Sequence, residues 1–396
     1  MKRVIIAGVG PGSKSCLTEE VKEAIDNSEV LIGSKRLIEE YTDKKTFYAV
    51  TAKDIIDIID NENANNYVVL MSGDTGFYSG AKKLAEALAG KYEYSIMAGV
   101  SSVIYLAAKI GKSWENAVFV SLHGKKQSYI PVVLQNELTY FLTQANVSQI
   151  CQELYRAGLG QAHIWIGENL SYDNEKITNG NVSEFTEYIS EGLTVLAVYN
   201  EHSRAFSITG IADSSFIRSD VPMTKREIRA SVVSRMAVSK NSCVYDIGAG
   251  TGSVTVELAL HALYGTVYAV ERTEEGCSLI AKNAEKFGLN NIEIIHGNAA
   301  AVIDRLPVPD KVFIGGSGGE LEYIFSSILK KNPYVHIVVT AVTLETLNNT
   351  ISLMEKNGMN VLDIVQIAVT EVKKRGRYHM MSANNPVFII EGRGAK

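Results

Sequence analysis

The sequence has few cysteines, no long apolar run, no signal-peptide pattern at Met1–Ala7 and no metal-ligand spacing, and each of these gaps argues against a class of protein. The 396 residues include four cysteines with no Cys-x-x-Cys pair, so we expect a reduced, cytoplasmic protein. No apolar run reaches the roughly 18 residues of a membrane-spanning helix. The start, Met1–Ala7, reads as a strand rather than a signal peptide. The seven histidines lack metal-ligand spacing, so no metal site is expected.

The chain also has fewer positively than negatively charged side chains. Lys and Arg number 39 against 44 Asp and Glu, a formal net charge of -5. This argues against nonspecific nucleic-acid binding, because such proteins are usually basic. Hydrophobic residues make up 46% of the chain, which is enough for two ordinary cores. The chain is too long for one typical domain, so two are expected.

Apolar runs and amphipathic stretches alternate along the chain, as is typical of α/β proteins. Near the start, Thr18–Asn27 reads as a helix with a threonine N-cap. The alternation restarts at Cys243 and predicts one doubly wound, Rossmann-like sheet in the second half. We therefore expect domains at residues 1–205 and 222–396, joined by a linker at 206–221.

The second half contains a strand, a glycine turn and an acid at the end of the next strand. The turn is Gly248-Ala249-Gly250-Thr251-Gly252; Asp246 precedes it and Glu271 closes the next apolar run. Glycines let the backbone approach a ligand, and the N–H groups that open the next helix point toward it. A carboxylate so placed can accept hydrogen bonds from both hydroxyls of a ribose. Ser253 stands where a dinucleotide fingerprint needs glycine, which disfavours a nicotinamide dinucleotide.

This arrangement resembles the class I S-adenosylmethionine (SAM) methyltransferases. The resemblance implies cofactor contacts from Asp246, Gly248, Gly250, Thr251, Gly252, Glu271, Gly297, Asn298 and Ala299. The last three follow the third strand, where these enzymes place adenine contacts, although Asn298 also suits a simple turn. A nicotinamide-dependent oxidoreductase and a glycine turn without a ligand are the alternatives.

Three flanking motifs narrow the resemblance. They are Pro222–Arg229 before the sheet, Phe313–Gly318 after its fourth strand and Ala341–Thr346 after its fifth. Together they are similar to the precorrin C15-methyltransferases (decarboxylating) of corrin synthesis, with Thr340 where that family has asparagine. Methyltransferases of nucleic acids or protein amides often carry Asn/Asp-Pro-Pro-aromatic after strand four, which this chain lacks. The resemblance implies substrate contacts from Thr224, Lys225, Arg229, Gly316, Ser317 and Thr343.

A second glycine turn, Gly8-Val9-Gly10-Pro11-Gly12, follows the first strand. Downstream stand Gly73-Asp74, Phe77-Tyr78, Ala98–Ser102 and Ser121–Gly124. This constellation resembles the tetrapyrrole methylases, in particular the precorrin C5-methyltransferases, which hold SAM folded between two α/β lobes. Ala98 and Lys125 depart from that family's usual proline and arginine. The implied cofactor contacts are Asp74, Phe77, Gly99, Val100, Ser101, Ser102, Leu142 and Thr143, and the implied substrate contacts are Gly10 and Pro11.

The two resemblances, in this order, match the fused precorrin-6Y C5,15-methyltransferase family (decarboxylating). They imply a SAM site in each domain and methylation of a precorrin or cobalt-precorrin at C5 and C15, with decarboxylation of the C12 acetate, in cobalamin biosynthesis. The sequence does not distinguish a metal-free from a cobalt-containing substrate. A homo-oligomer is expected by analogy, with neither nucleic acid nor membrane as a partner. A SAM methyltransferase with another acceptor is the alternative.

Basic residues are expected around a substrate that carries many carboxylates. Lys225 and Arg229 share one face of a helix, so we expect both to bind substrate; the alternative for the basic residues is a solvated surface. A second basic run comprises Lys373, Lys374, Arg375 and Arg377. An electron-rich meso carbon can attack an already activated methyl group without a strong base, so no catalytic residue is assigned. The candidates are Asp74, His123, Lys225 and Arg229.

Overall fold

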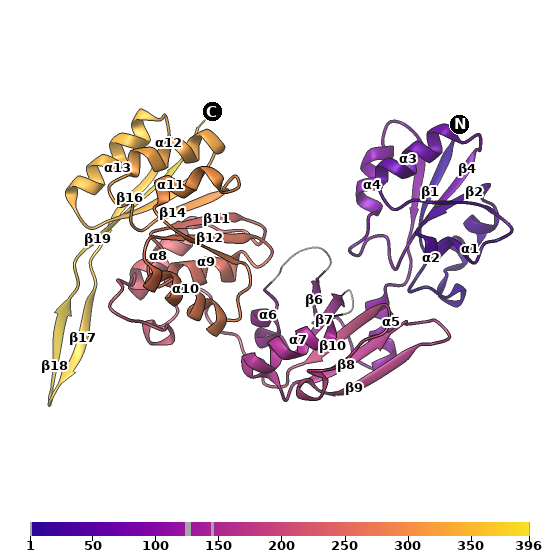
Figure 1. Ribbon diagram of the computed structural model, residues 1–396, viewed down its shortest axis with the longest axis horizontal. Coiled ribbons are helices and arrows are strands. Elements are labelled where there is room, and N and C mark those ends of the chain that lie inside the picture. The colour runs from indigo at the N-terminus through magenta and orange to yellow at the C-terminus, as the bar shows by residue number, and fades with distance from the viewer. Residues whose placement is uncertain (1, 123–127, 144–145, 396) are drawn as a thin grey trace. The chain divides into compact units, whose positions relative to one another are not determined.

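The computed structural model describes residues 2–122, 128–143 and 146–395. Among these residues, the chain divides into two compact units. The first comprises residues 2–122, 136–143 and 146–203, and the second comprises 128–135 and 204–395. In Figure 1 the first unit runs from indigo to magenta, and residues 204–395 of the second unit continue to yellow.

The first unit begins with a five-stranded parallel sheet in the order β3-β2-β4-β1-β5. Its strands are β1 (Arg3–Gly8), β2 (Val30–Gly33), β3 (Lys45–Tyr48), β4 (Asn66–Met71) and β5 (Glu93–Met97). Its helices are α1 (Glu19–Asp26), α2 (Lys35–Ile38), α3 (Ala52–Asn61) and α4 (Ala81–Leu88). The expected cap of α1 is confirmed, since the Thr18 hydroxyl accepts the N–H of Val21 at 3.3 Å.

A second, mixed sheet completes the first unit, in the order β6-β7-β10-β8-β9. Its strands are β6 (Val118–Ser121), β7 (Leu138–Thr143), β8 (His163–Glu168), β9 (Lys176–Asn181) and β10 (Thr194–Tyr199). Its helices are α5 (Ser102–Ile110) and α7 (Val147–Leu154), and α7 continues into a π-helical turn at Tyr155–Leu159. β6 and β7 pair in parallel and the other pairs are antiparallel. The unit therefore has two α/β lobes.

The second unit is built on a seven-stranded sheet in the order β13-β12-β11-β14-β15-β19-β16. Its strands are β11 (Cys243–Ile247), β12 (Thr266–Glu271), β13 (Ile292–His296), β14 (Lys311–Ile314), β15 (His336–Ala341), β16 (Asn360–Ile367) and β19 (Val387–Arg393). Its helices are α6 (Ile130–Gln135), α8 (Arg226–Met236), α9 (Ser253–His261), α10 (Glu274–Lys286), α11 (Ala299–Val302), α12 (Leu321–Lys331) and α13 (Leu344–Lys356). The chain winds from β11 out to β13 and then returns to β14 on the other side of β11. The doubly wound sheet is thus confirmed, with a topological switch between β11 and β14.

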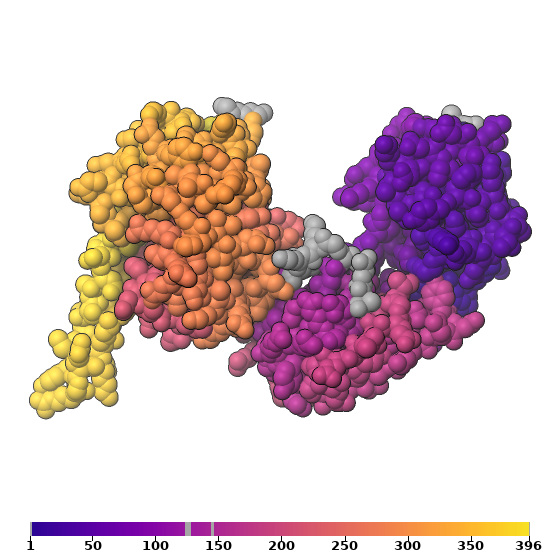
Figure 2. Space-filling view, in the orientation of Figure 1, coloured from indigo at the N-terminus to yellow at the C-terminus, as the bar shows by residue number. Residues whose placement is uncertain are grey.

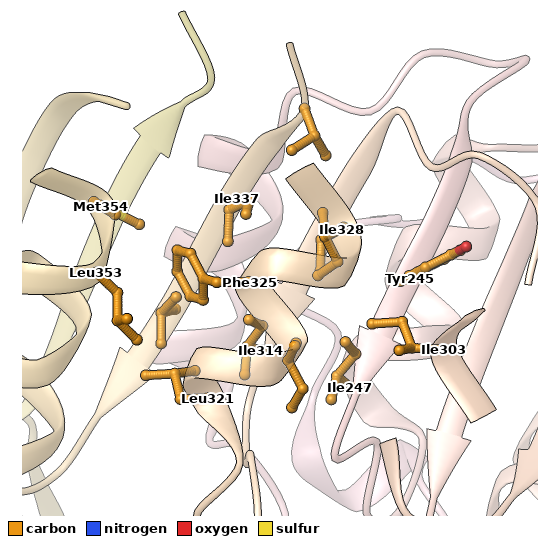
Figure 3. Close-up of a cluster of buried hydrophobic side chains, with 14 of the residues drawn as sticks. Tyr245, Ile247, Ile303, Ile314, Leu321, Phe325, Ile328, Ile337, Leu353 and Met354 are labelled. Atoms are coloured by element: carbon orange, nitrogen blue, oxygen red, sulfur yellow. The ribbon is translucent and has the colours of Figure 1, made fainter. Parts of the chain in front are cut away.

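Helices bury both faces of this sheet. α8, α9 and α10 cover one face, and α12 and α13 cover the other (Figure 1). In Figure 3, Phe325 of α12 and Met354 of α13 pack against Ile314 and Ile337 of the sheet. Burial on both faces explains why these strands read as continuous apolar runs rather than alternating ones.

The segment expected to be a linker, 206–221, is instead part of the second unit. Ile211 and Phe216 are buried in the core beneath α8 and α9. A shorter segment from the first half of the chain also belongs here: the Ser128 hydroxyl donates to Asn291 Oδ1 at 2.7 Å and accepts the N–H of Asn290 at 2.9 Å. A contiguous division of the chain near residue 205 is therefore incomplete, because α6 lies with the second unit.

A two-stranded hairpin interrupts the last part of the sheet. β17 (Thr370–Arg375) pairs with β18 (Tyr378–Ala383) and with no other strand in the described residues. The hairpin projects from the rest of its unit as a yellow ribbon in Figure 1 and a narrow extension in Figure 2. Within the described part of the chain, every helix falls short of the length and apolar character that a membrane span requires.

Candidate functional site

The first unit contains a cavity at the carboxyl ends of its parallel strands. Loops after β1, β4 and β5 form one wall, and residues of the second lobe form the other. The lining residues are Pro11, Ser72, Gly73, Asp74, Phe77, Tyr78, Ser101, Ser102, Leu142, Thr143, Leu170, Tyr172, Leu193, Thr194 and Val195. A ligand in this cavity would contact both lobes.

Asp74 organises the loops of the first wall. Its Oδ1 accepts the N–H of Gly76 at 2.8 Å, and its Oδ2 accepts the N–H of Gly99 at 3.0 Å. The loops pack so closely that a Cβ on Gly99 would lie 2.4 Å from the carbonyl oxygen of Gly73. Asp74 thus ties the loop after β4 to the loop after β5, and each of its oxygens keeps a lone pair for a ligand.

Aromatic rings line the same cavity. Phe77 meets Tyr78 and Phe119 edge to face, with ring centroids 4.8 and 5.2 Å away. Tyr78 has a left-handed φ of 50°, which bulky residues rarely adopt, and its side chain is 58% exposed. An exposed ring on constrained backbone is available to pack against a flat or apolar ligand.

The structure brings most of the predicted N-terminal residues to this cavity. Those that line it are Pro11, Asp74, Phe77, Ser101, Ser102, Leu142 and Thr143. Gly10, Gly99 and Val100 belong to the same loops but do not line it, and Gly10 instead forms a β-bridge with Gly73. The predicted His123 lies outside the described residues. Leu170, Tyr172 and 193–195 of the second lobe also line the cavity and were not predicted, because no glycine motif marks them.

The second unit has a cavity where its strand order reverses, beyond the carboxyl ends of β11 and β14. The lining residues are Val221, Pro222, Gly248, Gly250, Val270, Glu271, Arg272, Thr273, Gly297, Asn298, Ala299, Gly316, Ser317 and Gly318. A Cβ on Gly248 would lie 2.6 Å from the carbonyl oxygen of Gly316, so these loops meet only because position 248 is glycine. Gly316 and Gly318 face open space, which leaves a cradle for a ligand.

Glu271 ends β12 at this cavity and is 7% exposed. Its Oε2 accepts the N–H of Gly250 at 2.9 Å, and its Oε1 accepts both the N–H and the hydroxyl of Thr273 at 2.9 and 2.8 Å. The carboxylate therefore fixes the glycine turn and keeps a lone pair on Oε2 for a ribose hydroxyl. The cradle and this acceptor together fit the nucleoside part of SAM.

Asp246 lies beneath the glycine turn and not in the cavity. Its side chain is fully buried; Oδ2 accepts the Thr255 hydroxyl at 2.5 Å and Oδ1 has no partner within the described ranges. Burial, together with the nearby charge of Glu271, raises the pKa of Asp246 to about 7. The expected direct contact of Asp246 with the cofactor is therefore wrong. Thr251 and Gly252 are also buried and do not line the cavity.

Arg229 is not a substrate contact, because its side chain is 0% exposed and fully paired. Its guanidinium forms ion pairs with Glu257 at 2.5 Å and with Asp213 at 3.2 Å. It also donates to the carbonyl oxygens of Thr224 (2.6 Å) and Ile211. The shared helix face correctly placed Lys225 near Arg229, but both turn toward the same Asp213. Lys225 is partly exposed and remains open to a ligand.

The other predicted residues of this unit separate into two groups. Gly297, Asn298, Ala299, Gly316 and Ser317 line the cavity with Gly248, Gly250 and Glu271. Asn298 also caps α11, since its Oδ1 accepts the N–H of Ala300 at 2.9 Å. Thr343 caps α13 and Thr224 contributes its carbonyl to Arg229; neither lines the cavity. The basic run Lys373–Arg377 lies on the β17–β18 hairpin.

The described part of the chain holds no metal-binding cluster. Across residues 2–122, 128–143 and 146–395, no group of three or more His, Cys, Asp or Glu side chains could hold a metal ion. The expected absence of a metal site thus stays a prediction.

A glycine turn that opens a helix, an acid on the next strand and a cavity at the topological switch define a SAM-dependent methyltransferase fold in the second unit. Residues 215–392 match the profile of the precorrin methyltransferase domain, and residues 3–186 match the profile of the tetrapyrrole (corrin/porphyrin) methylases.

Two relatives found by sequence have names that agree with these profiles. The chain is 41% identical over 194 residues to a probable cobalt-precorrin-6B C(15)-methyltransferase (decarboxylating) of Saccharolobus solfataricus, covering 47% of this chain and 96% of that one. It is 27% identical over 349 residues to the precorrin-6Y C(5,15)-methyltransferase [decarboxylating] of Sinorhizobium sp., covering 85% and 84%. A solved precorrin-6Y C5,15-methyltransferase of Geobacter metallireducens GS-15 is 34% identical, covers 48% of this chain and 98% of its own, and has a TM-score of 0.45.

The chain belongs to the precorrin methyltransferases, with a tetrapyrrole methylase in its first half and a precorrin C15-methyltransferase domain in its second. It is therefore an enzyme of methyl transfer, and its family uses SAM.

Proposed function

We propose that each unit of the chain binds one SAM and that both act on the same corrin precursor. The second unit methylates C15 and removes the C12 acetate carboxyl as carbon dioxide; the first unit methylates C5. The observation that supports this most strongly is that each unit has its own glycine-turn cavity at the carboxyl ends of parallel strands. The Sinorhizobium relative, whose name states both carbons, aligns over 85% of the chain.

Alignment is the main task of the protein in this chemistry. When bound, SAM supplies a methyl group already activated by its sulfonium, so the site must position an electron-rich ring carbon in line and exclude water. In the second unit, Glu271 and Gly250 would hold the nucleoside in a cavity that Pro222 and Ser317 also line. In the first unit, Asp74 and its tied loops would do the same.

Decarboxylation needs a group that orients the acetate carboxylate while its electrons flow into the conjugated ring. With Arg229 buried, Lys225 is the remaining basic residue of the predicted pair. The Lys225 ammonium lies 3.9 Å from the Asp213 carboxylate. Lys225 closely follows Val221 and Pro222, which line the cavity. We propose that Lys225 orients the carboxylate that is lost.

Mass spectrometry of the product tests the proposal directly. The full chain is incubated with excess SAM and a precorrin-6B-type substrate, with and without cobalt. Two methyl groups gained and one carbon dioxide lost are the expected change, and the preferred form of the substrate identifies the metal requirement. Asp74→Asn should reduce methylation at C5 and spare C15. No methyl gain in either form, with SAM binding intact, would assign the enzyme a different acceptor.

We also propose that the chain forms a homo-oligomer through the β17–β18 hairpin. An isolated two-stranded hairpin is marginally stable and leaves both strand edges unpaired. Val372, Tyr378, Met380 and Met381 of this hairpin are all exposed apolar side chains. A second copy would cover them. Light scattering should give a multiple of the 43.2 kDa chain mass, and Met381→Glu should shift it toward the monomer; a monomeric wild-type chain would refute this proposal.

A further inference from the structure

Arg36 is a half-buried cation without a counter-charge. It lies in α2, directly after β2. Its three acceptors in the described residues are neutral oxygens: the carbonyl of Pro11 at 3.3 Å, the Ser72 hydroxyl at 2.9 Å and the Tyr172 hydroxyl. No carboxylate within the described ranges lies within ion-pair distance of it. An uncompensated guanidinium at a partly buried position is therefore available to an anion from outside the chain.

All three acceptors of Arg36 line the N-terminal cavity. Pro11 and Ser72 come from the first lobe and Tyr172 from the second. The described lining contains no lysine or arginine, and its one acid is Asp74, each of whose oxygens accepts one backbone N–H. Arg36 does not line the cavity itself, but it donates hydrogen bonds to three residues that do.

The guanidinium still has unused donors. Of its five N–H bonds, Nη1 uses two and Nη2 uses one on the three neutral oxygens. The N–H of Nε and one N–H of Nη2 remain without an acceptor in the described part of the chain. Two such N–H groups are what a guanidinium offers to a carboxylate in paired hydrogen bonds.

Tyr172 keeps this group in place. The Arg36 guanidinium carbon lies 5.8 Å from the centroid of the Tyr172 ring. The ring packs directly on the glycine turn, since a Cβ on Gly12 would lie 2.1 Å from it. The position of Arg36 is therefore set by contacts to both lobes rather than by a partner charge.

We propose that Arg36 binds a carboxylate of the ligand in the N-terminal cavity, namely a carboxylate arm of the macrocycle; this rests on the proposed C5-methyltransferase function. The methionine carboxylate of SAM has the same chemistry and is the other source that the geometry allows. Either carboxylate would supply the counter-charge that Arg36 lacks, and the experiment separates the two.

Steady-state kinetics of C5 methylation by the full chain test this inference. Arg36→Gln should raise the KM for the macrocycle about 10- to 100-fold, as expected for loss of hydrogen bonds to a charged group, with KM for SAM and C15 methylation unchanged. Arg36→Lys should recover part of the loss, because it restores charge without the paired geometry. Lys35→Gln is the matched control, since this neighbouring cation is exposed and pairs with Glu39 at 3.6 Å.

The outcomes are distinct. A selective rise in the KM for SAM would support a carboxylate site and assign it to the cofactor. Unchanged KM values for both ligands in Arg36→Gln would overturn the inference, as would a loss in kcat alone that tracks a lower Tm of the first unit and is not recovered by lysine. If the wild-type chain does not methylate C5, the proposed function fails before the variants are compared.

Discussion

Replacing Arg229 by methionine should destabilise the second unit more than any exposed substitution in it. The substitution leaves the buried Glu257 carboxylate, which is 0% exposed, without its counter-charge. Glu257 still accepts the N–H groups of Gly210 and Ile211, at 2.8 and 3.0 Å. Removing one partner of a buried ion pair typically costs about 3–5 kcal/mol. The carbonyls of Ile211 and Thr224 also lose a donor, so the cost should fall in the upper part of that range.

For a unit of this size, such a loss lowers Tm by roughly 6 to 20 °C, at about 2–4 °C for each kcal/mol. Differential scanning calorimetry of the full chain would measure the transition of the second unit, with that of the first as an internal reference. Arg218→Met is the control, because Arg218 is exposed and should change stability by less than about 0.5 kcal/mol.

A double-mutant cycle separates the ion pair from general loss of packing. Glu257→Gln removes the buried charge, so Arg229→Met should cost less in that background, with a coupling of at least about 1 kcal/mol. Additive effects of the two substitutions, or a Tm for Arg229→Met within 2 °C of the wild type, would refute the reasoning. A destabilisation of 1 kcal/mol should lower Tm by at least about 2 °C in a unit of this size.

Three further results are expected. Glu271→Ala should weaken SAM binding to the second unit about 10- to 100-fold by removing charged acceptors and should abolish C15 methylation while C5 methylation persists; unchanged C15 product would contradict this site. Gly99→Ala should cost about 1–3 kcal/mol through overpacking, because its Cβ would lie 2.4 Å from backbone, with loss confined to the first unit in calorimetry. Since the pKa of Asp246 is raised from 3.8 to about 7, its protonated form stabilises the fold at low pH. That contribution is lost as pH rises from about 4 to about 7, at about 1.4 kcal/mol per unit. Asp246→Asn should therefore gain stability relative to the wild type across this window, and a pH-independent difference in Tm would argue against the burial effect.

The predicted residues that do line the cavities are those whose chemistry is local. A glycine turn after a strand constrains its own backbone, so Gly248, Gly250 and Asp74 could be assigned from short motifs. The doubly wound sheet followed from the alternation of apolar runs, which reports burial of both faces.

The errors arose where partners are distant in sequence. Arg229 read as an exposed helix residue, but Glu257 is 28 residues away and Asp213 is 16 residues away, and only the folded chain brings both carboxylates to one guanidinium. Asp246 was assigned to the ligand because it adjoins the turn, yet the strand points it into the core. The second-lobe wall with Tyr172, and the hairpin that carries the basic run, depend on how strands pair, which periodicity does not specify.

Because α6 belongs to the second unit, the two units of this enzyme cannot be separated by a single cut in the chain. This segment, 128–135, is encoded between β6 and β7 of the first unit yet hydrogen-bonds to Asn290 and Asn291 of the second. A gene divided near codon 205 would encode the second half without residues 128–135. The first half would keep this segment but lose its hydrogen bonds to Asn290 and Asn291. A second half that is produced alone would therefore need residues 128–135 attached to it to complete its fold.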